Sequence, residues 1–295
     1  MGKPVKPTAG GQKSAPSMSI QLKKAREQAM RAGQIPNDLG LLPDTFIQPR
    51  GKNLPSWFTN FNGRWVMEKR KLKLRSVEFF SAVMYRYFMV RPRPRLELGK
   101  IPGIAKDLHR EMYERFAAGD LTPMEGRICD GMLGSLKRRM AQRAPNTRLL
   151  WTVHRYLSSP KRMSYKAAAM PRQKGATLAD ASGLVQAVVR IHSLQSLQHV
   201  KKISERGERG KMTVREVVVD AQGRETPLDE FVKKQAEVGV PEGAKETIEY
   251  LVVQKNLRKG KEGPWIVWGT VEETTLDKVK KQGRKSLMQL YQNEV

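Results

Sequence analysis

Hydrophobic residues recur with a helical period in the first half of the chain and with a period near two in the second half. A helix is predicted from about residue 66 to 90, with one apolar face formed by Val77, Phe80, Ser81, Met84 and Phe88. The Pro-rich segment 91–95 must end it, because proline removes a backbone donor and clashes with the preceding turn. A second helix should close at Gly119, a residue suited to a left-handed C-cap, and its apolar stripe is Ile104, Leu108, Met112 and Phe116.

A third helix is predicted to begin at Thr122. This residue offers an N-cap, Pro123 takes the first helical position, and Glu125 stands three residues after the cap. The buried face of this helix would consist of Met124, Ile128, Met132, Leu136 and Met140. More cations gather at its last turn than the helix dipole requires, namely Lys137, Arg138, Arg139 and Arg143.

The period then changes towards two, and turns rich in Pro, Gly and charge separate the apolar runs. We therefore expect strands at residues 149–157, 163–170, 184–197, 214–219, 248–256 and 265–271. A short helix is expected at 229–238 and a basic helix at 275–291. One of Trp265 and Trp268 should pack beneath a helix while the other caps the sheet. Helices followed by strands predict an α+β domain with an antiparallel sheet.

The sequence predicts three parts: a basic, largely extended N-terminal extension (1–65), the α+β domain (66–280) and a C-terminal helical tail (281–295). Ser19 begins a basic pattern that fits either a helix folding on an anionic partner or a solvated helix. Residues 36–55 should lie extended over a surface. The aromatic residues that follow fit either a membrane-interface or ribosomal-groove anchor or packing against the domain, and they are Trp57, Phe58, Phe61 and Trp65.

Charge is distributed unevenly along the chain, whose formal net charge is +26. Residues 1–75 carry 15 Lys and Arg against 4 Asp and Glu, whereas residues 216–295 carry 13 against 14. Residues 131–179 carry eleven Lys and Arg and no Asp or Glu. Such a window on a folded surface attracts polyanions, because each cation near a phosphate releases counterions. The alternative is a solvated face, which normally carries both signs.

The candidate RNA contacts are therefore cations of this window, of the Pro-spaced segment before it and of the N-terminal helical pattern. They are Arg91, Arg93, Arg95, Lys137, Arg138, Arg139, Arg143, Arg148, Arg155, Lys161, Arg162, Lys166, Arg172, Lys174, Lys23, Lys24 and Arg26. A plain exposed loop is the alternative for segment 91–95. The chain shows no paired aromatic residues of the kind that stack single strands, so we expect contact with folded RNA through its phosphates.

Known catalytic patterns are missing from the sequence. It contains no Walker-type loop, no dinucleotide fingerprint and no Gly-x-Ser-x-Gly elbow. Cys129 is the only cysteine, and the four histidines (His109, His154, His192 and His199) lack the spacing of metal ligands. We therefore expect neither metal nor cofactor. No apolar run is long enough to span a bilayer, so any membrane contact should be peripheral.

Five segments, in this order, resemble the domain shared by the mitochondrial ribosome receptor and the peripheral subunit of the inner-membrane import motor. They are Asp38-Leu39-Gly40-Leu41-Leu42-Pro43-Asp44-Thr45-Phe46, Tyr85-Arg86-Tyr87-Phe88, Tyr113-Glu114-Arg115-Phe116-Ala117-Ala118-Gly119-Asp120-Leu121, Leu133-Gly134-Ser135-Leu136-Lys137 and Trp265-Ile266-Val267-Trp268-Gly269-Thr270-Val271-Glu272-Glu273-Thr274. The first segment is similar to the ribosome-receptor branch, which in many organisms is a protein of the large mitoribosomal subunit.

The resemblance implies a cone of helices on a strongly bent antiparallel sheet, of the nuclear-transport-factor-two-like class. It also implies a non-enzymatic protein of the mitochondrial matrix, peripheral to the inner membrane and seated near the polypeptide exit. The partners implied are large-subunit rRNA, neighbouring mitoribosomal proteins, and the insertase or anionic lipid, with no small-molecule substrate. The alternative is a peripheral scaffold of the import motor, which would need a long helical region for chaperone contact ahead of the domain.

Overall fold

The computed structural model describes residues 37–170, 177–206, 212–219, 223–238 and 243–281. Residues 40–295 form one compact unit, and it is this unit that is described below. The predicted helix after Ser19 and most of the predicted C-terminal helix lie outside the described residues. Residues 276–281, at the start of that predicted helix, are helical.

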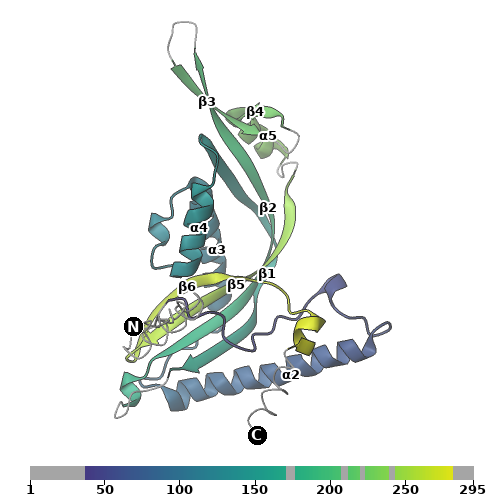
Figure 1. Ribbon diagram of the computed structural model, residues 1–295, viewed down its shortest axis with the longest axis vertical. Helices are drawn as coiled ribbons and strands as arrows, with labels where there is room; N and C mark the ends of the chain where they lie inside the picture. Colours follow the sequence, from purple (N-terminus) through teal and green to yellow (C-terminus); the bar gives the residue numbers. More distant parts are fainter. Residues whose placement is uncertain (1–36, 171–176, 207–211, 220–222, 239–242, 282–295) are drawn as a thin grey trace, which may run out of the picture. The chain divides into compact units, whose positions relative to one another are not determined.

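The unit is built around a six-stranded sheet in which every pair of neighbouring strands is antiparallel (Figure 1). The long strand β2 pairs along one side with β1 and along the other side with β5 and then β3. The other edge of β5 pairs with β6, and the other edge of β3 pairs with β4. The strands are β1 (Thr147–Ala169), β2 (Gly183–Arg206), β3 (Met212–Val219), β4 (Glu225–Pro227), β5 (Lys245–Arg258) and β6 (Lys261–Val271). The predicted α+β class with an antiparallel sheet is confirmed.

The two strands predicted at 149–157 and 163–170 are one continuous strand, β1. The pairing of β1 with β2 shifts register at four places between Val153 and Ser164, so β1 bulges where a turn was expected. Pro160 caused that expectation. It is tolerated here because β1 pairs with a single described strand, and proline can stand at a sheet edge where no ladder donor is needed.

Three helices have the bounds that the sequence predicts, to within a few residues. Helix α2 (Phe61–Met84) continues as a π-helical turn, Tyr85–Met89, and ends before the Pro-rich segment. Helix α3 (Ile101–Ala118) closes at Gly119, whose φ of 84° is left-handed and whose N–H bonds to carbonyls of the last turn. Helix α5 (Leu228–Val238) occupies the short predicted segment.

The predicted start of the third helix is wrong. Thr122–Met124 forms only a 3-10 turn, and helix α4 (Asp130–Ala141) begins eight residues after Thr122. The intervening residues bond to β6 instead: Cys129 N donates to Val267 O (2.8 Å), and Val267 N donates to Arg127 O (2.8 Å). Backbone pairing with the sheet edge therefore outweighs a local capping signal.

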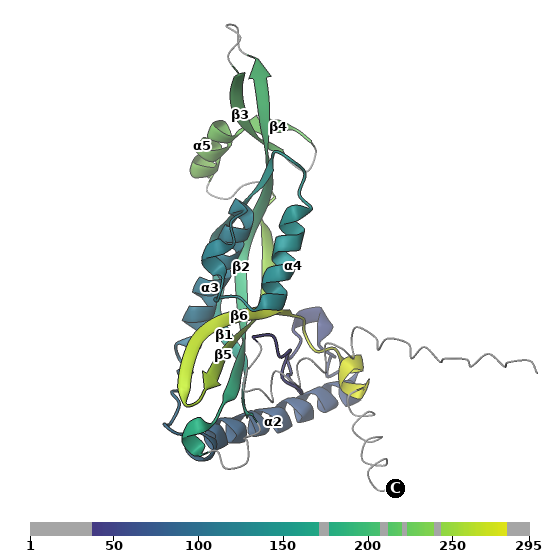
Figure 2. The ribbon, with the colours of Figure 1, turned by 60° about the vertical axis from the view of Figure 1, so that its left-hand side comes forward.

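The two faces of the sheet are covered differently. On the helix face, alternate residues of β2 such as Val189 and Ile191 share one core cluster with Leu108 and Met112 of α3 and Leu136 of α4 (Figures 1 and 2). Trp265 belongs to this cluster, whereas Trp268 packs on the opposite side of β6, as expected of the two tryptophans.

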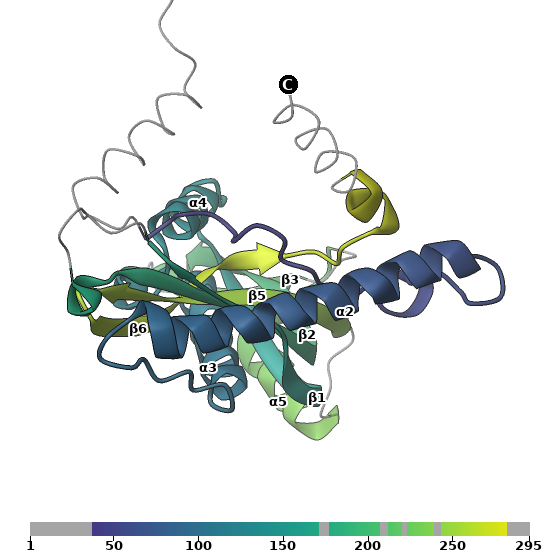
Figure 3. The same cartoon turned by 90° about the horizontal axis from the view of Figure 1, so that it is seen from below.

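We call the opposite side the extension face, because residues 40–48 lie against it. Ile47 packs with Val188, Tyr250 and Val252; its N–H donates to Thr274 Oγ1, and its carbonyl accepts from the backbone N–H of Thr274. Of the segment expected to lie extended over a surface, the part around Ile47 does so, whereas Gly51–Asn53 forms a 3-10 turn. Helix α2 crosses the strands near the end of β1 (Figure 3), where Ser164 donates a hydrogen bond to Glu78.

Candidate functional site

The cations of α4 are divided between structural and free positions. Arg143 donates to Phe116 O (2.6 Å) and to Ala117 O (3.3 Å), and its guanidinium lies 4.4 Å from the Phe116 ring centre. It thus satisfies carbonyls at the end of α3, and burial followed by the charge of Arg139 lowers its pKa. Arg139 also stacks on Phe116 (5.4 Å). Lys137 pairs with Glu125 (2.7 Å), whereas Arg138 is exposed and has no partner within the described ranges.

Three of the strand cations also have partners inside the protein. Arg148 pairs with Glu216 on β3 (2.5 Å). Arg162 donates to Leu98 O (3.1 Å), and Lys166 donates to Pro43 O (2.5 Å). Residues 131–179 contain no Asp or Glu, yet a carboxylate and carbonyls from distant segments bind these three cations in the folded protein.

Arg155 and Lys161 differ from these three. Both are exposed, and neither has an ion-pair partner among the described residues. They share the extension face with Arg148 and Lys166, because the β2 partners of all four have even numbers and so point to the same side of the sheet. In chain order, Arg148, Arg155, Lys161 and Lys166 pair with Val200, Leu194, Arg190 and Gln186. Arg162 stands opposite Val189 and so belongs to the helix face.

The Pro-spaced arginines lie in the connection between α2 and α3. Arg91 and Arg95 are exposed, and Arg93 lies over the Tyr87 ring at 5.4 Å. The backbone N–H of Arg95 donates to Glu262 (2.7 Å), which fixes this connection to β6. The remaining candidates, Lys23, Lys24, Arg26, Arg172 and Lys174, lie outside the described residues.

One cation that the sequence reasoning passed over is Arg190. It lies on the extension face of β2, directly opposite Lys161. The sequence could have indicated this residue, because Arg190 is the only Lys or Arg within the apolar run 184–197 and a cation in a buried strand needs a partner.

A second exposed feature is the outer face of α2. The residues that α2 buries are Gly63, Met67, Leu74 and Ala82. The apolar face predicted from Val77, Phe80, Met84 and Phe88 is mostly exposed instead, and so are Phe61, Trp65, Leu72 and Phe79. The segment that contains Leu276 and Val279 covers this side of α2, and small or flexible residues fit beneath it. A Cβ on Gly63 would lie 2.9 Å from Leu276.

Four aromatic residues at or just before the start of α2 are also exposed, namely Trp57, Phe58, Phe61 and Trp65. Trp57 packs against Phe61 and Arg64, so packing against the domain is contradicted only for the other three. The acidic residues of α2 offset only some of its cations, because Glu68 pairs with Arg64 and Lys71 while Glu78 bonds to Ser164. The outer face therefore joins exposed aromatic and aliphatic side chains to unneutralised lysines, Lys69 and Lys73.

A buried polar cluster lies on the helix face. Glu249 accepts hydrogen bonds from Tyr113 (2.6 Å) and Gln195 (2.9 Å) and shares a 2.7 Å hydrogen bond with His109 Nε2. Trp151 donates to Gln195 (2.9 Å) and stacks on Tyr113. Burial alone would raise the pKa of Glu249, but the hydrogen bond and charge of His109 and the hydrogen bonds from Tyr113 and Gln195 lower it to about 2.

This cluster contains the kind of carboxylate and tyrosine set that the sequence did not reveal. Its members come from α3, β1, β2 and β5, so no spacing along the chain could indicate it. The carboxylate oxygens are held by protein side chains, and the cluster ties α3 to three strands. Within the described ranges, no three His, Cys, Asp or Glu residues are placed to hold a metal ion.

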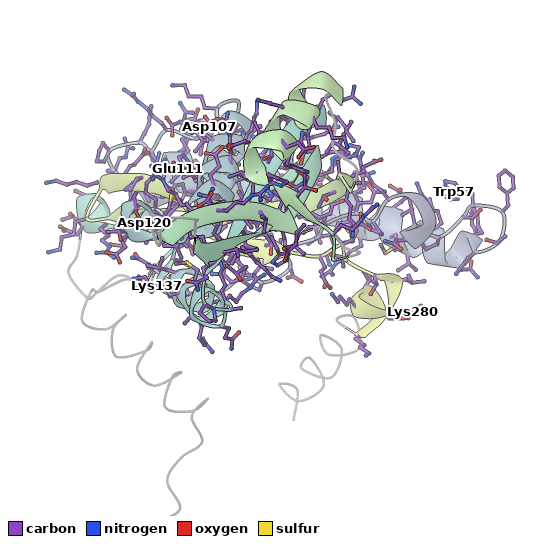
Figure 4. The ribbon with its side chains drawn as sticks, turned by 90° about the horizontal axis from the view of Figure 1, so that it is seen from above. Trp57, Asp107, Glu111, Asp120, Lys137 and Lys280 are labelled. Atoms are coloured by element: carbon purple, nitrogen blue, oxygen red, sulfur yellow. The ribbon has the colours of Figure 1, made fainter. Side chains whose placement is uncertain are left out.

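The described helices also bear on how the protein can meet a membrane. None of them is both long enough and apolar enough to cross one. Trp57, next to α2, and Lys137, on α4, lie on opposite sides of the view in Figure 4. The fold and its surfaces define a basic α+β protein with an exposed aromatic helix and a separate group of free cations.

Residues 24–227 match the family described as MBA1-like protein, and the chain belongs to this family. It is a family of mitochondrial, ribosome-associated membrane proteins, with a role in membrane insertion. The resemblance to a mitochondrial ribosome receptor is confirmed at this level. A comparison with curated proteins finds no match.

Proposed function

We propose that the protein is a non-enzymatic component of the mitochondrial large ribosomal subunit near the polypeptide exit. In this role it binds rRNA and helps to dock the ribosome on the inner membrane or its insertase. The observation that carries the proposal is the presence of two unlike surfaces on one domain. Free cations lie along α4 and β1, whereas exposed aromatic residues lie on α2.

The rRNA side consists of cations that nothing in the described protein neutralises. Arg138, Arg155 and Lys161 are exposed, and each can release counterions from a phosphate. Their partnered neighbours, Arg143 and Arg148, hold the surrounding backbone in place. Arg138 belongs to the helix side of the sheet and Arg155 and Lys161 to the extension face, so rRNA would contact the domain at two places, through phosphates and shape.

The membrane side consists of the outer face of α2. Interfacial helices combine bulky apolar residues, which enter the headgroup region, with lysines that attract anionic lipid. Leu72 and Phe79 supply the first kind and Lys69 and Lys73 the second. A strand rises about 3.3 Å per residue, so along β1 the free cation Arg155 lies at most roughly 30 Å from the α2 contact at Ser164 and Lys161 roughly 10 Å from it. One domain can therefore contact both RNA and lipid.

Cosedimentation of the full-length protein with mitochondrial large subunits tests the rRNA side. Binding should weaken steeply with salt, because each phosphate contact contributes a slope of about −0.7 to −0.9 in log K against log salt. Reversing Arg138 and Arg155 to Glu should weaken binding at least tenfold, while reversing the exposed Lys280 and Lys281 makes the same change of charge with little effect. Arg162 is unsuitable for this test because it bonds to Leu98 O.

Two results would contradict the proposal. Salt-insensitive binding, or equal losses in the two double variants, would remove rRNA contact through this surface. Absence of ribosome binding together with binding to a chaperone would favour the import-motor scaffold.

A further inference from the structure

Arg190 is a buried cation that the described protein leaves incompletely satisfied. Its exposed fraction is 8%. One guanidinium nitrogen donates to Ser158 Oγ (3.0 Å), but Nε is buried without a hydrogen-bond partner. No carboxylate within the described ranges lies within ion-pair distance of it. A guanidinium keeps its proton in proteins, so this charge cannot be removed by titration.

The neighbours of Arg190 add positive charge. Lys161 stands directly opposite on β1, on the same face of the sheet, and like charges in this arrangement destabilise a strand pair. Burial is the main cause that lowers the pKa of Arg190, and the positive charge of nearby Arg50 is the next. Three cations thus approach one another on the extension face.

The nearby carboxylates are occupied by other groups. Glu273 accepts hydrogen bonds from the Tyr250 hydroxyl (2.7 Å), Asn53 Nδ2 (3.1 Å) and the backbone N–H of Arg50 (3.3 Å). Glu246 pairs with His192 (2.6 Å). Neither forms an ion pair with Arg190, although Glu273, whose three donors are neutral, keeps its negative charge beside the backbone of Arg50.

We infer that Arg190, Lys161, Arg50 and Ser158 form a binding site for one phosphate group of an RNA backbone. A phosphate offers several acceptor oxygens for the guanidinium, and because Nε has almost no accessible surface, contact with Nε requires the side chains that cover it to move aside. Lys161 would approach the same anion from the position opposite Arg190 on β1. The inference rests on the proposed rRNA-binding function and adds a buried anchor to its exposed cations.

RNA is favoured over a lipid headgroup by the surroundings of the site. Arg155 continues the positive surface along the same face of β1, in the direction a nucleic-acid backbone could follow. The large exposed aromatic side chains that would accompany a lipid site lie on α2 and just before it.

Replacing Arg190 by Met in the full-length protein tests the inference, with a fluorescently labelled RNA hairpin followed by anisotropy at several salt concentrations. We expect at least tenfold weaker binding and a salt slope smaller by about 0.7 to 0.9, the contribution of one phosphate. Without RNA, the thermal midpoint should stay the same or rise, because the variant removes an unpaired buried charge. Arg110→Met is the matched control, since Arg110 pairs with Glu114 on the surface of α3.

Further arms separate the possible anions and guard against misfolding. Inorganic phosphate should raise the thermal midpoint of the natural protein and leave that of Arg190→Met unchanged. Arg190→Lys keeps the charge without the planar fork and should give an intermediate RNA affinity. Vesicles of phosphatidylcholine and cardiolipin should bind both proteins equally.

Three results would overturn the site. The first is an equal loss of RNA affinity in Arg190→Met and Arg110→Met. The second is a thermal midpoint that Arg190→Met lowers while Arg190→Lys keeps full RNA affinity. The third is vesicle binding that depends on Arg190. Failure of the site and failure of the proposed function are distinguishable. If Arg190→Met still cosediments fully with large subunits while the Arg138 and Arg155 double variant does not, the function stands without this anchor.

Discussion

Replacing Leu72 and Phe79 by Ser should release the protein from anionic bilayers without unfolding it. Both side chains are largely exposed, at 71% and 65%, so the folded domain loses little packing. Full burial of a Leu or Phe contributes about 1.5–3 kcal/mol, and about two thirds of each side chain is available to a membrane. The double variant should therefore lose roughly 3 kcal/mol of membrane affinity, which corresponds to about 100-fold.

The assay is flotation of the purified protein with liposomes that contain cardiolipin. Leu197 and Val232 supply a matched control, because both are exposed apolar residues located away from α2, and changing both to Ser should leave flotation intact. Reversing Lys69 and Lys73 to Glu should also weaken binding, since each lysine near an anionic surface contributes about 1 kcal/mol. Equal flotation of the Leu72 and Phe79 variant and its control would refute the assignment of α2 to the membrane.

Three further predictions concern stability. The pKa of Glu249 is about 2 in the folded protein against an ordinary 4.5, so its ionised form should add about 3 kcal/mol to the free energy of unfolding above pH 4.5. This contribution is lost as the pH falls towards 2, so urea unfolding of Glu249→Gln should depend less on pH in that window than unfolding of the natural protein. Gly183→Ala places a Cβ 2.9 Å from a ring carbon and should lower the unfolding free energy by about 1–3 kcal/mol, whereas Gly99→Ala, with open space around it, should not. Arg143→Met should cost about 1 kcal/mol in chemical denaturation and Arg138→Met less than about 0.5, and equal costs would contradict the division between structural and free cations.

The helices and strands that could be predicted are those whose signals are local. The stripe of α3 and its closing Gly119 lie within one segment, and the end of the helical region before residue 91 follows from the prolines after it. The start of α4 could not be predicted from Thr122, because pairing of Cys129 with β6 depends on residues far along the chain. The same reason applies to β1, where Pro160 looks like a turn until the edge position of the strand is known.

The candidate cations could be read from the sequence, but their arrangement could not. The absence of acid between residues 131 and 179 is a property of the sequence, whereas the pairing of Arg148 with Glu216 is a property of the sheet. A window along the chain cannot show which cations a neighbouring strand neutralises. Periodicity alone also could not decide which apolar side of α2 is buried, because the helix has two.

The bulges of β1 have a consequence for a protein placed where new polypeptides emerge. The outer edge of β1 has no strand partner in the described part of the chain, and an unpaired edge can recruit any extended peptide. Four register shifts and a proline interrupt the regular spacing of N–H and C=O groups that such a peptide would need. The irregularity of this strand can therefore protect unfolded chains nearby from being captured by the sheet.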